Sequence, residues 1–247
     1  MKKGDVFSNR YGDIIEVLSY SDYYNVRVRF TGKYEWENTL EKGQILKGEF
    51  KNYYKPSIHG VGFIGRGKYD SKTGGGVVYR AWSDMLRRCY SEKSYIKNPS
   101  YIGCSVEPKW HNFQNFAEWY VNHQFYGFGY EIDKDLLVEG NKIYGEDYCT
   151  LLPKSLNIML TSLIKKDSVL PKGVRFDRNK YNVRLQIGGI RKSIGRFDSL
   201  TEAGEAYNKA KGESLYELAD RYKEVITEES YLAIMRLGNE IKKEEVK

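Results

Sequence analysis

Three short runs between Gly173 and Phe197 carry the side chains with the clearest chemistry in this sequence. Each run alternates apolar and polar residues, as strands with one buried face do, because successive side chains of a strand point to opposite faces. Alternation places Val183, Leu185 and Ile187 on one side of the middle run. The opposite, polar side of the three runs is predicted to hold Arg175, Arg184, Gln186, Arg191 and Ser193. These residue types hydrogen-bond guanine edges, adenine edges and phosphates in the major groove of DNA.

Turn and cap signals position these runs. Residues 177–180 and the Gly188-Gly189 pair predict two tight turns, and Ser199 followed by Glu202 predicts a capping box at a helix start. We therefore expect a three-stranded antiparallel sheet packed on one helix over about Asp167 to Tyr222, with Val174, Phe176 and Ile194 facing inward. The alternative interpretation is a half-exposed sheet whose polar residues are simply solvated.

Positive charge is concentrated in the same stretch. The whole chain has a net charge of +7, and residues 167–197 contain eight Lys and Arg against two Asp and Glu, whereas residues 198–247 contain eight against twelve. Lys180 adds a cation at the first turn. A basic segment favours a polyanionic partner, although many basic proteins bind none.

The segments 172–175, 180–185 and 193–203, together with Ala206-Tyr207, resemble the ethylene-response-factor type DNA-binding domain of plants. The same module occurs in phage and mobile-element homing endonucleases. The resemblance implies that the groove-reading residues are Arg175, Arg184, Gln186, Arg191 and Ser193, the set already reached from alternation. The sequence departs from the family at Tyr181, where Trp is favoured, and at Ser193, where an aromatic is usual. These departures leave the base preference open.

Residues 79–160 resemble the nuclease region of phage HNH endonucleases, through the spacings Trp82-x2-Met85-x2-Arg88-Cys89-Tyr90, Tyr101-x2-Cys104-x-Val106-x3-Trp110, and Asp133-Lys134-Asp135 through Cys149 to Asn157. Such nucleases use a histidine to deprotonate a water, a metal to hold the leaving oxygen, and an Asn or His to complete the site. Where the family pattern reads Asp-His this chain has Asp133-Lys134, and lysine is a poor base unless it is desolvated.

The resemblance implies a candidate catalytic set of His111, Asp133, Lys134 and Asn157. Asp133 and Asp135 are the candidate ligands of Mg²⁺ or Mn²⁺, because hard cations prefer oxygen ligands. Each has an ordinary alternative: paired carboxylates in a loop are as often turn formers, and His111 directly after Trp110 is more often part of a helix start.

The organisation expected along the chain is α+β and multidomain. We predict a small SH3-like, β-barrel-like domain over 1–68, a flexible Gly-rich linker over 69–78, an HNH-derived α+β domain over 79–166, and the DNA-binding sheet with its helix and a C-terminal helix over 167–247. Further helices are expected over 78–90, 112–123 and 227–241 from apolar residues at helical spacing. The aromatic stripe of the second of these is expected to be core.

Other classes are disfavoured. No apolar run approaches the roughly 20 residues that span a bilayer, so no membrane partner is expected. Three widely spaced cysteines without a C-x-x-C pair predict reduced thiols in a cytoplasm, that of the host if the protein is phage-encoded. The predicted function is that of a double-stranded DNA-binding protein of phage or mobile-element type, resembling HNH homing endonucleases, that could nick DNA weakly with a metal. The alternative is a catalytically inactive, HNH-derived DNA-binding regulator or counter-defence protein.

Overall fold

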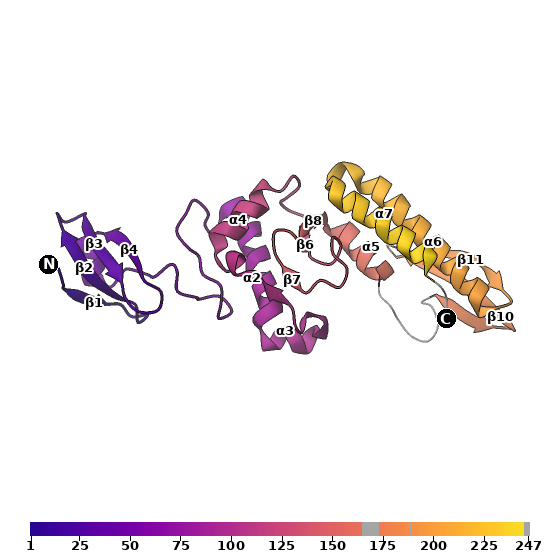
Figure 1. The fold of residues 1–247 in the computed structure, drawn as a ribbon, viewed down its shortest axis with the longest axis horizontal. Coiled ribbons are helices and arrows are strands. Elements are labelled where there is room, and N and C mark those ends of the chain that lie inside the picture. Colours follow the sequence, from indigo (N-terminus) through magenta and orange to yellow (C-terminus); the bar gives the residue numbers. More distant parts are fainter. Residues whose placement is uncertain (165–172, 188, 245–247) are drawn as a thin grey trace. The chain divides into compact units, whose positions relative to one another are not determined.

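The computed structural model describes residues 1–164, 173–187 and 189–244. The chain divides into two compact units, one made of Met1–Ser100 and Val106–Glu118, the other of Tyr101–Ser105 and Trp119–Lys247. Both helices and antiparallel sheets are present (Figure 1), so the predicted α+β class is confirmed. The boundary between the units passes within the region expected to be one central domain, and the division into three domains stays a prediction.

The first unit begins with a four-stranded antiparallel sheet. Its strands are β1 (Val6–Ser8), β2 (Ile14–Tyr20), β3 (Val26–Phe30) and β4 (Trp36–Leu40), in that spatial order. Alternation buries one face, where the fully buried side chains of Ile15, Val17, Val26 and Val28 meet helix α1 (Lys42–Lys47) through Ile45. The expected β-barrel-like closure is not formed by these strands: β1 and β4 are the two edges of an open sheet.

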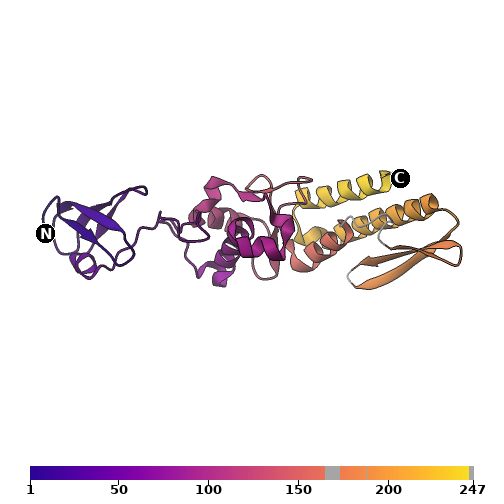
Figure 2. The ribbon, with the colours of Figure 1, turned by 90° about the horizontal axis from the view of Figure 1, so that it is seen from below.

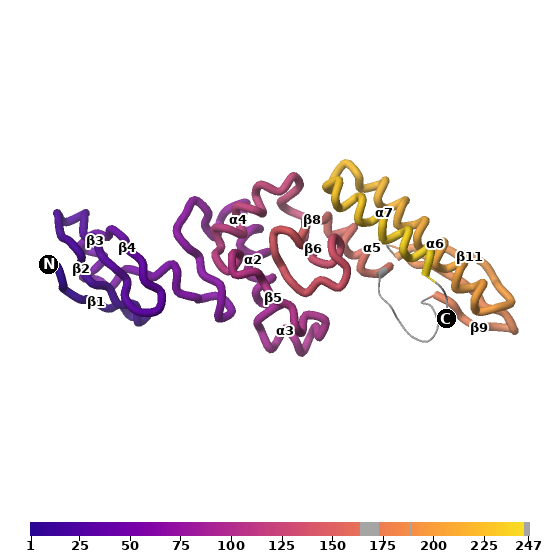
Figure 3. The backbone as a smooth tube through the Cα atoms, in the orientation of Figure 1, coloured from indigo at the N-terminus to yellow at the C-terminus, as the bar shows by residue number. Residues whose placement is uncertain are grey.

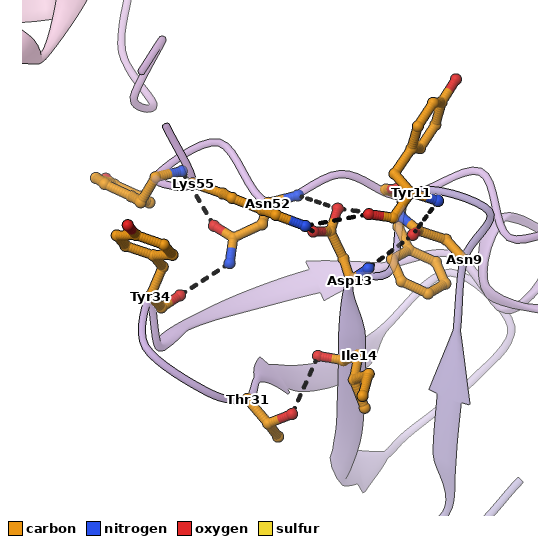
Figure 4. Close-up of polar contacts among 10 residues, drawn as sticks. Asn9, Tyr11, Asp13, Ile14, Thr31, Tyr34, Asn52 and Lys55 are labelled. Atoms are coloured by element: carbon orange, nitrogen blue, oxygen red, sulfur yellow. Dashed lines mark hydrogen bonds and ion pairs between the residues drawn. The ribbon is translucent and has the colours of Figure 1, made fainter. Parts of the chain in front are cut away.

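A buried polar network fixes the loops at one end of this sheet (Figure 4). The Asp13 carboxylate accepts hydrogen bonds from Asn9 Nδ2 at 3.1 Å, from the Asn52 backbone N–H at 3.1 Å and from Lys55 Nζ at 3.0 Å. Asn9 Oδ1 in turn accepts the backbone N–H groups of Tyr11 and Asp13, both at 2.9 Å. Burial alone would raise the pKa of Asp13, but the bonds from Lys55, Asn52 and Asn9 outweigh burial and lower it. The charged carboxylate therefore ties residues 9–13 to residues 50–55.

The remainder of the first unit is mostly helical. It contains η1 (Thr73–Gly76), α2 (Val77–Tyr90), α3 (Glu92–Lys97) and η3 (Pro108–His111), with η2 (Pro99–Tyr101), β5 (Ser105–Val106) and α4 (Phe113–Asn122) at the boundary between the units. The expected helices over 78–90 and 112–123 are confirmed as α2 and α4. The aromatic stripe of α4 is core as predicted, because Phe113, Phe116 and Tyr120 are fully buried.

The Gly-rich stretch before α2 is closely packed at its beginning, over residues 58–63, and the flexible linker expected over 69–78 stays a prediction. Ile58 pairs with Gly62 and Phe63 pairs with Asn112 through isolated β-bridges. A Cβ on Gly62 would lie 2.4 Å from Leu86 Cδ1, so only glycine permits this close approach to α2. The sequence signal of repeated glycines reflected close packing as well as turns.

The second unit begins with a small sheet and a helix. Strand β6 (Tyr130–Asp133) pairs antiparallel with β8 (Thr150–Pro153), and β7 (Ile143–Tyr144) lies in the loop between them. Figure 3 traces this loop from β6 back to β8 and then into α5 (Lys154–Ile164). The start of the expected DNA-binding domain at Asp167 follows α5 and lies outside the described residues.

The predicted three-stranded antiparallel sheet is present near the C-terminus. It contains β9 (Val174–Asp177), β10 (Lys180–Ile187) and β11 (Ile190–Phe197), with β10 in the centre. The turn between β9 and β10 places both Arg178 (φ 49°) and Asn179 (φ 60°) in the left-handed region. In the second turn Gly189 has φ 85°, and Gly188 lies outside the described residues.

Two long helices complete this unit, α6 (Leu200–Tyr222) and α7 (Glu228–Lys243), joined by η4 (Lys223–Val225). Figure 2 shows the sheet on one side of α6 and α7 on the other. Ser199 Oγ accepts the Glu202 backbone N–H at 3.1 Å, so the Ser199 bond of the predicted capping box is confirmed, and α7 confirms the last expected helix. One core joins the sheet and α6 with α5 and α7, and it contains Leu156, Leu160, Val174, Val183, Leu185, Ala203, Tyr207, Leu215, Ile234 and Ile241.

Candidate nucleic-acid interface

The exposed face of the β9–β11 sheet carries polar and cationic side chains in cross-strand rows. Directly opposed residues of an antiparallel pair share a face, so the strand register assigns the rows. The first row is Arg175, Asn182 and Arg196, the second is Arg184 and Ser193, and the third is Gln186 and Arg191. We call these seven residues the polar face. The opposite face is buried, with Val183 at 0% and Leu185 at 2% exposure.

Close packing of the backbone holds this face in register. The Arg184 N–H donates to the Gly173 carbonyl at 2.9 Å. Gly173 has φ 96°, and a Cβ there would lie 2.1 Å from the Arg184 carbonyl oxygen. Any other residue at position 173 would push β10 away at the point where Arg184 leaves the sheet.

A β-bulge brings Arg196 into the polar face. The register between β10 and β11 shifts between Val183 and Arg184, so that Ile194 is the extra residue of β11. Simple alternation from Arg191 and Ser193 would place Arg196 on the helix side with Ile194. Because of the bulge, Arg196 lies opposite Asn182 instead. The sequence interpretation missed Arg196 for this reason, while Ile194 packs on the helix side as predicted.

The arginines of the polar face have no carboxylate partner among the described residues. None of Arg175, Arg184, Arg191 and Arg196 forms an ion pair there, and the Arg191 guanidinium instead donates to Gln186 Oε1 at 3.4 Å. Lys180, also predicted to contact DNA, differs because its ammonium lies 2.8 Å from the Asp198 carboxylate. The Arg196 guanidinium donates to the Asp177 carbonyl at 3.5 Å, and without carboxylate partners these four arginines keep their charge and most of their donors for a ligand.

One predicted inward residue of this sheet is not buried. Phe176 shares the helix-side face with Val174 by parity, but its side chain is 59% exposed. Its ring packs beside Tyr181 with centroids 4.9 Å apart, at the end of the sheet next to the turn. Phe176 therefore contributes little to the core.

The candidate nuclease residues of the second unit line one cleft of about 720 Å³. Asp133, Asp135 and Asn157 contribute to its wall, beside apolar residues of α5 and α7. Asp133 Oδ1 accepts the backbone N–H groups of Asp135 at 3.0 Å and Leu136 at 2.8 Å, which is a turn-forming role. Burial raises the pKa of Asp133. Asn157 Nδ2 donates to Glu131 Oε2 at 3.3 Å.

Lys134 lies between the two aspartates in sequence but does not line the cleft. Its side chain is buried, donates to the Asn141 carbonyl at 2.9 Å, and forms an ion pair with the Asp135 carboxylate. Asn141 Nδ2 returns a hydrogen bond to the Lys134 carbonyl at 2.7 Å. Lys134 thus closes the loop after β6, a structural role that the sequence comparison with the nuclease pattern could not indicate.

His111 belongs to the first unit, at the end of η3. Its Nε2 lies 3.1 Å from the Val106 carbonyl oxygen and 3.3 Å from the Tyr90 hydroxyl. Burial lowers the pKa of His111, and the contact with the Val106 carbonyl opposes this only in part. The neutral His111 imidazole donates to the Val106 carbonyl and contacts Tyr90, the last residue of α2. His111 therefore connects the end of α2 to residue 106.

These residues do not fit a divalent metal ion in their present arrangement. In the parts of the chain that the structure describes, no group of three or more His, Cys, Asp and Glu side chains could hold a metal. At the two predicted ligands, the Lys134 ammonium already balances the Asp135 carboxylate, and two backbone N–H groups already occupy Asp133 Oδ1.

Comparison with protein-family models, with curated proteins and with solved structures gave no match. The resemblances to the ethylene-response-factor domain and to HNH endonucleases therefore stay predictions. No helix among the described residues has both the length and the apolar character needed to cross a membrane. All three cysteines are buried thiols.

Proposed function

We propose that this protein binds double-stranded DNA through the polar face of the β9–β11 sheet and cleaves it weakly or not at all. The observation that carries the proposal is the set of four arginines without carboxylate partners in the described structure, arranged in rows with Asn182, Gln186 and Ser193. Arginine bonds the O6 and N7 atoms of guanine, and Asn and Gln bond the N6 and N7 atoms of adenine. The ethylene-response-factor resemblance supports the same face.

The shape of the sheet supports docking in the major groove. A β-ribbon fits into that groove, which is about 12 Å wide. The polar face belongs to a sheet whose other face is covered by α6, so the polar side chains project to the side away from the helix. The side chains at the rows can then reach base edges while Arg178, in the turn between β9 and β10, is available to phosphates.

The test is a fluorescence anisotropy titration of the full chain with a labelled duplex. The full chain is preferred to residues 167–222 alone because α5 and α7 contribute to the core of the sheet. We expect binding whose log K falls linearly with log[salt], with a slope of about −0.9 for each phosphate contact. Absence of duplex binding at low salt would refute the proposal.

Cleavage is a separate question, and the HNH resemblance keeps it open to experiment. Asp133, Asp135 and Asn157 do share a cleft, but Lys134 occupies the position where the nuclease pattern has its base and turns away from that cleft. Loss of a general base typically lowers a rate about 10²- to 10⁴-fold. We therefore expect little or no plasmid nicking with Mg²⁺ or Mn²⁺. Efficient nicking that survives Asp133→Ala with Asp135→Ala would place an active site elsewhere.

A further inference from the structure

A second cleft, of about 840 Å³, lies within the first unit and is basic. Its wall comes from the loop before β2, the end of β4, α1 with the residues after it, and the segment 64–70. Hydrogen bonds join these segments: the Gly65 N–H donates to the Tyr53 carbonyl at 2.9 Å, and Arg66 donates to Asn38 Oδ1. The size is that of ligand sites in proteins, which typically hold about 300–1,000 Å³.

The cleft is lined by four cations, Arg10, Lys47, Lys51 and Arg66. Within the described residues none of them forms an ion pair with a carboxylate. Two carboxylates, Glu49 and Asp70, also line the cleft. Asp70 is occupied by its own loop, because it accepts the Lys72 N–H at 2.9 Å and the Thr73 hydroxyl at 3.2 Å. The cleft therefore presents excess positive charge to an anionic ligand.

Exposed aromatic rings lie beside these cations. Tyr11 is 57% exposed and Tyr53 is 40% exposed, and the two come from loops on either side of the Asp13 network. The network holds the backbone of Tyr11 through Asn9 and Lys55, while Figure 4 shows the Tyr11 ring projecting away from it. Tyr53 packs edge-on against Trp36 with centroids 6.3 Å apart. Both rings are thus carried on fixed backbone.

We propose that this cleft binds a single-stranded nucleic-acid segment. Proteins that hold single strands combine a positively charged groove for the backbone with aromatic side chains on which unstacked bases lie. A concave site of this volume excludes a duplex, whose bases are stacked inside. The side-chain amide oxygens of Asn38 and Gln44 in the same wall already accept from Arg66 and from the Glu41 N–H, and their amide N–H groups can donate to the exposed edges of one or two bases. An acidic peptide would satisfy the cations but would offer no flat bases to stack on the exposed rings of Tyr11 and Tyr53.

This inference is independent of duplex binding by the β9–β11 sheet, and the experiment must separate the two. The full chain carrying Arg184→Ala and Arg191→Ala serves as background, so that binding by the sheet is suppressed. Labelled oligomers of dT and of U are titrated into it and into the same background with Tyr11→Ala or with Lys51→Ala. Tyr24→Ala, at another exposed tyrosine (67%) of the same unit, and Lys33→Ala are the matched controls.

We expect the background protein to bind dT or U oligomers, and the tighter of the two to identify DNA or RNA. Tyr11→Ala should weaken binding about five-fold or more, since stacking on one ring is worth about 1–3 kcal/mol. Lys51→Ala should flatten the salt dependence by about 0.7 in slope, the value for one contact to a single strand. Tyr24→Ala and Lys33→Ala should change neither. Thermal unfolding of each variant verifies that the fold is intact.

Two results would overturn the inference. One is equal loss of affinity in Tyr11→Ala and Tyr24→Ala. The other is competition by polyglutamate as effective as competition by an unlabelled oligonucleotide, which would assign the cleft to acidic peptides. Neither result bears on the proposal that the β9–β11 sheet binds duplex DNA, because that binding is measured on the chain without Arg184→Ala and Arg191→Ala. Conversely, failure of the duplex test would leave the single-strand titrations interpretable.

Discussion

Each unit contains an antiparallel sheet with one buried and one exposed face, and both exposed faces carry arginine. In the N-terminal sheet, Arg27 lies 2.6 Å from Glu37 and Arg29 lies 3.6 Å from Glu16. In the C-terminal sheet, no arginine of the polar face has such a partner among the residues described. Exposed ion pairs contribute about 0–1 kcal/mol to stability, so neither sheet depends on them for folding. The difference indicates that glutamates balance the arginine charge of the N-terminal sheet, whereas the arginines of the C-terminal sheet are left free to bind an anionic ligand.

The largest expected effect is a loss of duplex affinity that occurs when arginines are removed from the C-terminal sheet and not when they are removed from the N-terminal sheet. Arg184→Ala with Arg191→Ala is expected to weaken duplex binding by about 2–6 kcal/mol, because each bidentate base contact is worth about 1–3 kcal/mol. The matched change in the N-terminal sheet, Arg27→Ala with Arg29→Ala, should leave the Kd within about two-fold. Fluorescence anisotropy on one duplex measures both. Equal losses in the two variants would mean that net charge alone drives binding.

The next effect concerns folding of the N-terminal sheet. Asp13→Ala leaves Asn9 and the Asn52 N–H buried without their acceptor, so the free energy of unfolding should fall by about 2–3 kcal/mol. The pKa of Asp13 is lowered in the folded state, so its contribution is fully present above the unfolded pKa of about 3.9 and is lost as pH falls through the folded pKa. Wild type should lose this increment in acid, whereas Asp13→Ala should not. Denaturant unfolding between about pH 2 and 6 measures it, and duplex affinity at pH 7 serves as the control.

A smaller effect should distinguish reading of bases from attraction to phosphates. Gln186→Ala is expected to cost about 1–3 kcal/mol at the preferred site and to flatten base preference at one position. Lys180→Ala should weaken all sequences alike and only slightly, because Asp198 already pairs with that ammonium. Selection from a random duplex library reports both. An unchanged sequence preference in Gln186→Ala would remove that side chain from the reading surface.

The smallest effect tests the β-bulge. Arg196→Ala should reduce the slope of log K against log[salt] by about 0.9 if this arginine contacts one phosphate. Deletion of Ile194 removes the extra residue but keeps the pairings of Ser193, Gly195 and Arg196 in a regular ladder, so Arg196 should stay opposite Asn182 and the slope should stay at the wild-type value. Circular dichroism confirms that the deletion variant is folded. A full slope in Arg196→Ala would place Arg196 outside the interface.

The C-terminal sheet could be predicted from sequence because its determinants are local. Alternation in 181–187, the turn residues and the Ser199 cap each act within a few positions, and all three are present in the structure. Arg196 was missed and Phe176 was wrongly expected to be buried, since a bulge changes the face of a residue, and the end of a sheet its burial, without changing the pattern. The role of Lys134 depends on Asn141, seven residues away across a loop, and the open edges of the N-terminal sheet depend on pairings between distant strands. Such relations between segments have no local signature.

The turn joining β9 to β10 has a consequence for how this chain could change over generations. Arg178 has φ 49°, a conformation that disfavours residues with a Cβ by about 1–2 kcal/mol and that glycine adopts freely. A hairpin selected for thermal stability alone would carry glycine in this turn. Arginine instead adds a cation at the tip of the hairpin. A library screened for heat resistance should therefore enrich Arg178→Gly, while the same library screened for retention on DNA should deplete it. The residue found at position 178 then shows whether stability or DNA binding has been selected more strongly.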